Sequence, residues 1–185
     1  RDRAITEAKI NINQISAIAC TQGPGLLGSL LVGNSFSKSV SMGLKIPLIG
    51  VNHMQAHLLV HFIEDKEISA PNFPFIGVNV SGGHTQIILV KDYFDMEIIG
   101  NTLDDAIGEA FDKCGKTLGL DYPSGPKIDN LSKLGNPSKF NFPIPKVNGL
   151  NLSYSGSKTS FINFIKKEKD KDSNFISNNL NDICS

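Results

Sequence analysis

The chain has 185 residues, 40% of them hydrophobic and 19% charged, and its 18 basic residues balance 18 acidic ones. This composition is typical of one compact soluble domain or two small lobes, and the balanced charge does not by itself indicate a polyanionic partner. No apolar run reaches the roughly 18 residues that a membrane span needs, so no membrane contact is expected. The three cysteines form no Cys-x-x-Cys motif, and their odd number argues for free thiols in a reducing compartment.

Strand and helix patterns alternate in the first half of the chain, which predicts an α/β or α+β fold with helices covering the sheets. Short apolar runs predict strands over 15–20 and 47–51, with a helix over 26–43 between them. A helix that carries two histidines follows. Residues 73–90 then form two apolar runs around Ser81-Gly82-Gly83, a pattern typical of a β-hairpin.

Helices are expected to dominate after the hairpin. Acidic residues in a first turn and Gly119 at the end predict a helix over 104–118. A short helix over 127–134, a strand pair within 140–154 and a helix over 156–167 are expected next. Residues 169–185 are polar and rich in Asn, Ser and Asp, which predicts a disordered tail.

Charges are unevenly distributed in the second half of the chain. Nine acids against three lysines lie from Asp92 to Asp129, whereas six lysines and no acid lie from Asn130 to Lys167. Such runs are more often solvated faces than binding surfaces, so the lysines alone do not predict contact with nucleic acid.

A glycine-rich stretch, 23–28, satisfies the GxGxxG pattern between a strand and a helix. The dinucleotide fingerprint also needs an acid about 20 residues further on, but the next acid is Glu64. No Gly-Lys-Ser/Thr follows, so the stretch is not a Walker A loop either. We therefore favour a tight turn over cofactor binding, and a nicotinamide enzyme is disfavoured.

Two further patterns each allow a structural and a functional interpretation. The glycines of Ser81-Gly82-Gly83 permit a backbone nest for phosphate, although an isolated motif of this kind is usually an ordinary turn. The spacing of Asp105, Glu109 and Asp112 places three carboxylates on neighbouring positions of one helix face. They form either a solvated acidic face or a site for a cation or a hydroxyl-rich ligand.

His53 and His57 lie four residues apart in an apolar stretch, a spacing that allows two imidazoles to bind one metal ion. Met54 stands where a metalloprotease would have its glutamate, so the HExxH pattern is absent. His61 is a weaker candidate for the same face. A third ligand is not identifiable from spacing, and an ordinary histidine pair remains the alternative.

Five ordered blocks together resemble one family, that of the tRNA threonylcarbamoyladenosine biosynthesis transferase TsaD, formerly named a glycoprotease. The resemblance runs over nearly all of residues 1–160. The blocks are TQGPGLLGSLLVG, NHMQAHLL, VSGGHTQIILV, DDAIGEAFDKCGKTLGLDYPSGPKID and LSYSGSKT.

The resemblance implies an actin-like, Hsp70-like ATPase fold with two lobes around a nucleotide cleft, here a partial catalytic region over 1–168. It implies that His53 and His57 bind one divalent metal, iron or zinc, which polarises the carbamoyl group. The residues that the resemblance implies to contact substrate are Asn79, Val80, Ser81, Gly82, Gly83, Asp112, Gly125 and Asp129.

The implied reaction transfers the threonylcarbamoyl group from threonylcarbamoyl-AMP to the adenosine next to the anticodon of tRNA, and ATP or threonylcarbamoyl-AMP is the implied nucleotide ligand. A paralogous scaffold protein and a small ATPase are the implied partners, in the cytoplasm. Family members also carry an N-terminal phosphate hairpin and a C-terminal segment with a further metal-binding aspartate, neither of which is recognisable here. The chain starts with Arg1, which suggests a longer natural protein; a non-catalytic remnant or a nucleotide-binding scaffold is the alternative.

Overall fold

The computed structural model describes residues 2–63 and 69–185. The chain divides into two compact units, Arg1–Pro71 and Asn72–Ser185, which are treated separately below. Together they make a mixed α/β protein with two small sheets, in agreement with the expected class. Within the described ranges, no helix is long and apolar enough to cross a membrane.

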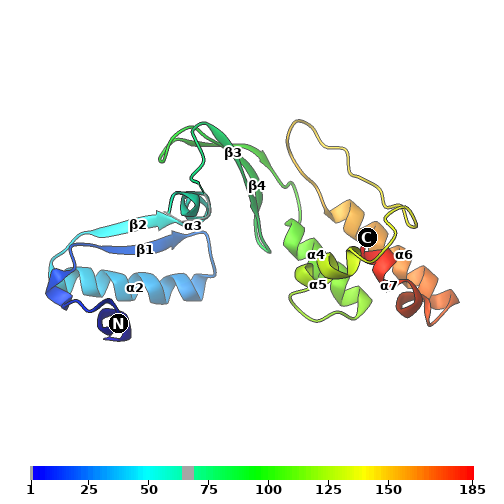
Figure 1. Cartoon of the computed structure of the whole chain (residues 1–185), viewed down its shortest axis with the longest axis horizontal. Helices are drawn as coiled ribbons and strands as arrows, with labels where there is room; N and C mark the ends of the chain where they lie inside the picture. The colour runs from blue at the N-terminus through cyan, green and yellow to red at the C-terminus, as the bar shows by residue number, and fades with distance from the viewer. Residues whose placement is uncertain (1, 64–68) are drawn as a thin grey trace. The chain divides into compact units, whose positions relative to one another are not determined.

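The first unit is built on two parallel strands joined by a long helix (Figure 1). Ile18 pairs with Leu48 in this two-stranded sheet, and α2 packs along the strands. The predicted strand, helix, strand and histidine-bearing helix are all present. The elements are α1 (Asp2–Ala8), η1 (Ile12–Gln14), β1 (Ile18–Gly23), α2 (Leu27–Leu44), β2 (Leu48–Asn52), α3 (His53–Leu59) and η2 (Val60–Phe62).

The second unit combines an antiparallel sheet, in the order β3-β4-β5, with four helices. The predicted hairpin is confirmed, with Val80 opposite Thr85 at its closed end. The predicted helix terminator is also confirmed, because Gly119 adopts a left-handed φ of 81°. The elements are β3 (Phe75–Val80), β4 (Thr85–Val90), β5 (Met96–Asn101), α4 (Ile107–Leu118), α5 (Gly125–Ser132), α6 (Ser155–Lys171) and α7 (Phe175–Cys184).

The C-terminal residues are helical, where the sequence analysis expects a disordered tail. Helix α6 continues to Lys171 and α7 follows it. The reason is hydrophobic burial: Ile183 joins Leu118 and Ile165 in the core of the second unit, and removing these side chains from water offsets the cost of ordering the helix. Around them pack Leu120, Phe140, Phe161, Phe164, Phe175, Ile176, Leu180 and Cys184.

The strand pair expected within 140–154 does not form. Residues 141–147 have no regular structure, and pairing is limited to one parallel bridge between Thr102 and Leu152. Pro143 and Pro145 explain the difference, because proline has no N–H to donate to a sheet ladder. The edge of β5 is instead covered by residues 150–152, of which Leu150 approaches Gly100 too closely for any side chain there.

Candidate metal and nucleotide sites

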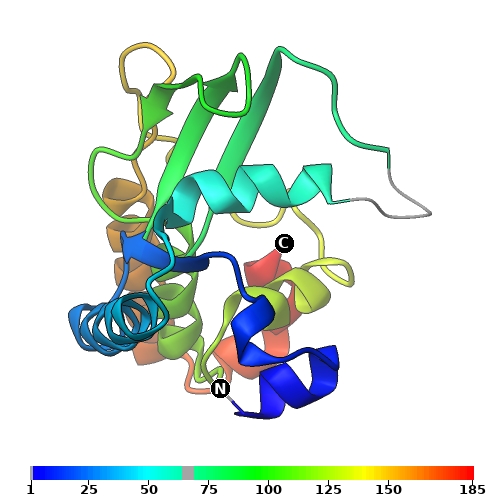
Figure 2. The ribbon, with the colours of Figure 1, turned by 90° about the vertical axis from the view of Figure 1, so that its left-hand side faces the viewer.

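Helix α3, which carries both histidines, begins directly after the end of β2 and is the turquoise helix in Figure 2. The side chain of Asn52 caps this helix by accepting hydrogen bonds from the N–H groups of Met54 and Gln55, at 2.9 and 3.1 Å. Met54 and Leu58 are buried, whereas His53 and His57, on the neighbouring face of the helix, are exposed to solvent.

The two imidazoles converge. The Nε2 atoms of His53 and His57 lie 3.2 Å apart, with ring centroids 4.5 Å apart. Two nitrogens bound tetrahedrally to one zinc ion at its usual bond length would lie about 3.3 Å apart, so the pair fits a shared ion. Within residues 2–63 and 69–185, no group of three potential ligands brings a third donor to them.

Ser81 organises the turn between β3 and β4. Its N–H donates to the carbonyl of His84 at 2.9 Å, and its Oγ accepts hydrogen bonds from the N–H groups of Gly83 and His84, at 3.3 and 3.0 Å. Gly82 and Gly83 are exposed, as a phosphate-binding turn requires, although the N–H of Gly83 already has a partner inside the turn. Of the two preceding candidates, Asn79 is buried and Val80 is exposed.

The first turn of α4 docks onto this hairpin. The N–H of Gly108 donates to the carbonyl of Ser81 at 3.2 Å, and the N–H of Ile107 donates to Oγ1 of the buried Thr85 at 2.9 Å. A Cβ at Gly108 would lie 2.7 Å from the Ser81 carbonyl oxygen. Sequence reasoning missed Gly108 and Thr85; a glycine near the start of a predicted helix was the signal available.

Asp112 joins α4 to α5. Its Oδ1 accepts a hydrogen bond from the N–H of Ser124 at 2.8 Å, immediately before Gly125 begins α5. Gly115, one turn along α4, is in close contact with the same serine. Asp129 lies one turn into α5 and pairs with Lys133 at 2.7 Å on the surface. The structure therefore links the hairpin turn, Asp112 and Gly125 through α4 and α5.

The three carboxylates predicted to share one face do not form a common site. Lys113 pairs with Glu109 at 2.6 Å and lies 3.7 Å from Asp105, which also pairs with Lys158, whereas Asp112 is used by Ser124. Lysine pairing offsets the repulsion between Asp105 and Glu109.

Asp104 was also missed by sequence reasoning and is the most extensively hydrogen-bonded carboxylate of this region. It accepts hydrogen bonds from the hydroxyls of Ser153 and Ser155, both at 2.6 Å, and from the N–H groups of Tyr154 and Ser155, at 2.8 and 3.2 Å. Burial raises the pKa of Asp104, but these four bonds outweigh burial and hold the pKa well below its usual range.

All three cysteines are free thiols, as their spacing predicts. Burial raises the pKa of the Cys114 thiol to about 11, against the opposing effect of Lys158, and burial also raises the pKa of Cys184. Neither thiol is therefore an activated nucleophile near neutral pH.

The chain thus presents an α/β framework with a convergent histidine pair in one unit and a glycine turn docked on a helix in the other. A family model described as tRNA N6-adenosine threonylcarbamoyltransferase, TsaD, matches residues 1–185, and the chain belongs to this family.

Curated relatives carry the same description. One from Christiangramia forsetii is 57% identical over 99% of this chain and 54% of its own length, and one from Riemerella anatipestifer is 58% identical over 100% and 54%. The chain therefore spans about half the length of the curated relatives it matches. Among solved structures, YeaZ from Pseudomonas aeruginosa matches 52% of this chain and 45% of its own chain at 13% identity, with a TM-score of 0.37, too low to establish a common fold.

Proposed function

We propose that the protein acts as a tRNA N6-adenosine threonylcarbamoyltransferase. In this reaction the amino group of the adenosine next to the anticodon attacks the carbamoyl carbon of threonylcarbamoyl-AMP, and AMP leaves. The match of the family model over residues 1–185 carries the proposal. The chain spans about half the length of its curated relatives, and the proposed activity is the one that their description names.

The adenylate is proposed to bind along the second unit. The exposed glycines of the Ser81-Gly82-Gly83 turn allow its phosphate to approach the backbone, and the N-terminus of α4 beside them favours negative charge. Asp129 is exposed and suits ribose hydroxyls, with Gly125 leaving room for the ligand. Since Asp112 holds the N–H of Ser124, its proposed contribution is to fix the start of α5 as much as to contact the nucleotide.

His53 and His57 are the proposed metal ligands, because their Nε2 atoms converge to a distance that suits one ion. A bound iron or zinc would act as a Lewis acid on the carbamoyl oxygen. The contribution of the chain itself is to present both imidazoles on a helix capped by Asn52 and anchored through Met54 and Leu58.

The actin-like two-lobe arrangement, the cytoplasmic location and the partners belong to the same proposal. The partners are tRNA, a paralogous scaffold protein and a small ATPase. A non-catalytic, nucleotide-binding scaffold is the second candidate for this chain by itself, since the chain spans about half the length of its curated relatives.

The histidine assignment can be tested with Co²⁺ as a spectroscopic probe. We expect the 185-residue chain to bind one Co²⁺ with visible absorption bands, and His57→Ala to weaken binding at least about tenfold because one imidazole cannot replace two. His61→Ala is the matched control, since this exposed histidine lies outside the convergent pair. Equal Co²⁺ binding by wild type and His57→Ala would remove the metal assignment.

The same three proteins can then be supplied with synthetic threonylcarbamoyl-AMP and a tRNA transcript, with the modified nucleoside measured by mass spectrometry. Product formation that falls with His57→Ala and not with His61→Ala supports the transferase. Metal binding without any product favours the non-catalytic alternative for this chain.

A further inference from the structure

The loop between β5 and α4 is fastened to the start of α6 from several sides. The N–H of Leu103 donates to the carbonyl of Leu152 at 2.8 Å, and the N–H of Leu152 donates to the carbonyl of Asn101 at 3.0 Å. Asp104 adds its four hydrogen bonds from residues 153–155. Because its pKa is held low, this carboxylate stays ionised, and remains a strong acceptor, throughout the neutral range.

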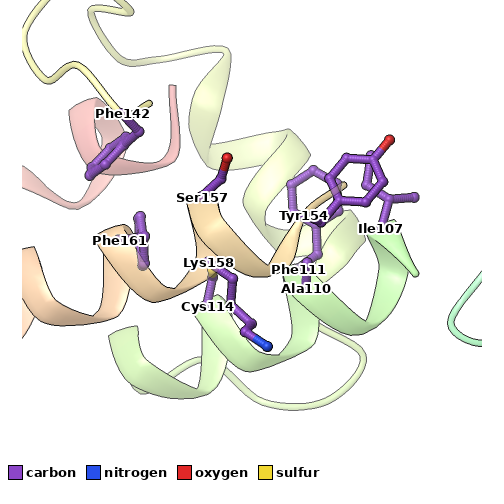
Figure 3. Close-up of a pocket in the computed structure, with 9 residues that line it drawn as sticks. All are labelled: Ile107, Ala110, Phe111, Cys114, Phe142, Tyr154, Ser157, Lys158 and Phe161. Atoms are coloured by element: carbon purple, nitrogen blue, oxygen red, sulfur yellow. The ribbon is translucent and has the colours of Figure 1, made fainter. Parts of the chain in front are cut away.

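Lys158 makes a second attachment one turn into α6. Its side chain is 16% exposed and pairs with Asp105, which is 18% exposed and follows Asp104 directly. The lysine forms part of the wall of an open cavity of about 240 Å³ between α4 and α6, whose other walls are mostly apolar and aromatic (Figure 3). An ion pair with so little access to water is less screened than one on the open surface.

The fastened loop leads directly to the turn of the hairpin. It ends at Ala106, which is 3% exposed, and the next two N–H groups hold Thr85 and Ser81. A displacement of this loop would therefore move the donors that hold the carbonyl of Ser81. The backbones at Gly108 and Ser81 are in such close contact that even a methyl group at Gly108 would collide with Ser81.

We propose that Asp104 and Lys158 are positioning residues, which fix the Ser81-Gly82-Gly83 turn through the start of α4 without touching the substrate. The inference rests on the proposed function, in which this turn receives the phosphate of the adenylate. The sequence motifs concerned, DDAIG and LSYSGSKT, then act as one unit although about 50 residues separate them.

The test compares Lys158→Met with Lys139→Met in the 185-residue chain. Methionine matches the length of lysine and suits the apolar cavity, and Asp105 retains Lys113 as a neighbour. Lys139 pairs with Asp182, away from the loop, so its substitution controls for the loss of an ion pair in the same unit. The readouts are the ¹H–¹⁵N signals of Gly82 and Gly83 and the Kd for AMP, used as the probe.

We expect Lys158→Met to shift both glycine signals and to weaken AMP binding about three- to tenfold, because coupling through packed elements is usually of this size. Lys158→Arg should restore both readouts, and Lys139→Met should change neither. Ser153→Ala, a milder variant that removes one hydroxyl from Asp104, should shift the same two signals in the same direction.

The two proposals fail in different ways. If wild type does not bind AMP but the glycine signals still respond to Lys158→Met, the nucleotide site is wrong and the positioning role stands. If the glycine signals in folded Lys158→Met and Ser153→Ala match those of wild type, the positioning role is wrong, whatever the affinity for AMP.

Discussion

Glycines set the distances between the elements of the second unit. Gly108 lets α4 approach the hairpin turn, and Gly115 lets the same helix approach Ser124. Gly115 lies in the interior of α4, where glycine costs about 1 kcal/mol relative to alanine, so close contact is the compensating gain; Gly108 lies in the first turn. A buried serine and a turn carbonyl are the groups that these glycines accommodate.

We predict that Gly108→Ala destabilises the second unit in spite of alanine's better helix propensity. The new methyl group would lie 2.7 Å from the Ser81 oxygen and 2.8 Å from the Gly82 nitrogen, and such overpacking typically costs about 1–3 kcal/mol. Urea unfolding followed by circular dichroism measures the change. The control is Gly156→Ala, at the corresponding position of α6, where the nearest side-chain atom is 3.9 Å away and stability should stay the same or rise. If Gly108→Ala were as stable as wild type, the Ser81-Gly82-Gly83 turn would have to move aside at little energetic cost, against the prediction.

Helices α4, α6 and α7 bury one shared core, in which Leu118, Ile165 and Ile183 are the most enclosed side chains. Around it, Phe140, Phe164 and Phe175 make mutual ring contacts with centroids 5.4–5.9 Å apart. Aromatic pairs at such distances add to the stabilisation from burial alone. Helix α7 is therefore part of the fold of this unit rather than an appendage.

We predict that Ile183→Ala lowers the free energy of unfolding by about 2–5 kcal/mol, because it removes buried methyl groups and leaves a cavity. Ile183 is 5% exposed, whereas Ile144, in the irregular segment, is 88% exposed. Ile144→Ala is thus a matched substitution for which little change is expected. Urea unfolding of the two variants measures the difference, and equal stabilities would mean that α7 does not pack on this core in solution.

The elements differ in how far the sequence could predict them. Helices α2 and α4 and the β3–β4 hairpin were predicted because periodicity and glycine signals agree there. Helix α7 is the exception: Phe175, Ile176, Leu180 and Ile183 have helical spacing, but the Asn and Ser between them have the composition of a disordered tail. The contacts of Asp104 and Lys158 were beyond prediction, since each joins residues about 50 positions apart.

On the scale of the whole chain, lysines of the lysine-rich stretch form ion pairs with acids of the acidic stretch. Lys158 from the lysine-rich stretch pairs with Asp105 from the acidic one, and Lys133 pairs with Asp129. The uneven distribution thus has an internal explanation for these lysines, and contact with tRNA is not required to account for them. In the first unit, by contrast, the notable surface feature is apolar. Five apolar side chains of its longest helix, α2, are each more than half exposed: Leu27, Leu31, Val32, Phe36 and Met42.

We predict that the 185-residue chain self-associates near neutral pH. Several exposed apolar side chains on one helix favour association, and a sequence pI of about 7.1 leaves little net charge to oppose it. The double substitution Leu31→Lys and Val32→Glu keeps the net charge unchanged and places two charges on that face, where Leu31 is 57% and Val32 73% exposed. It should shift sedimentation profiles toward monomer.

The control, Leu134→Lys with Ile144→Glu, charges two exposed positions of the other unit and should leave self-association as it is. A monomeric wild type at micromolar concentration would contradict the prediction, and equal effects of both pairs would locate the contact elsewhere than α2.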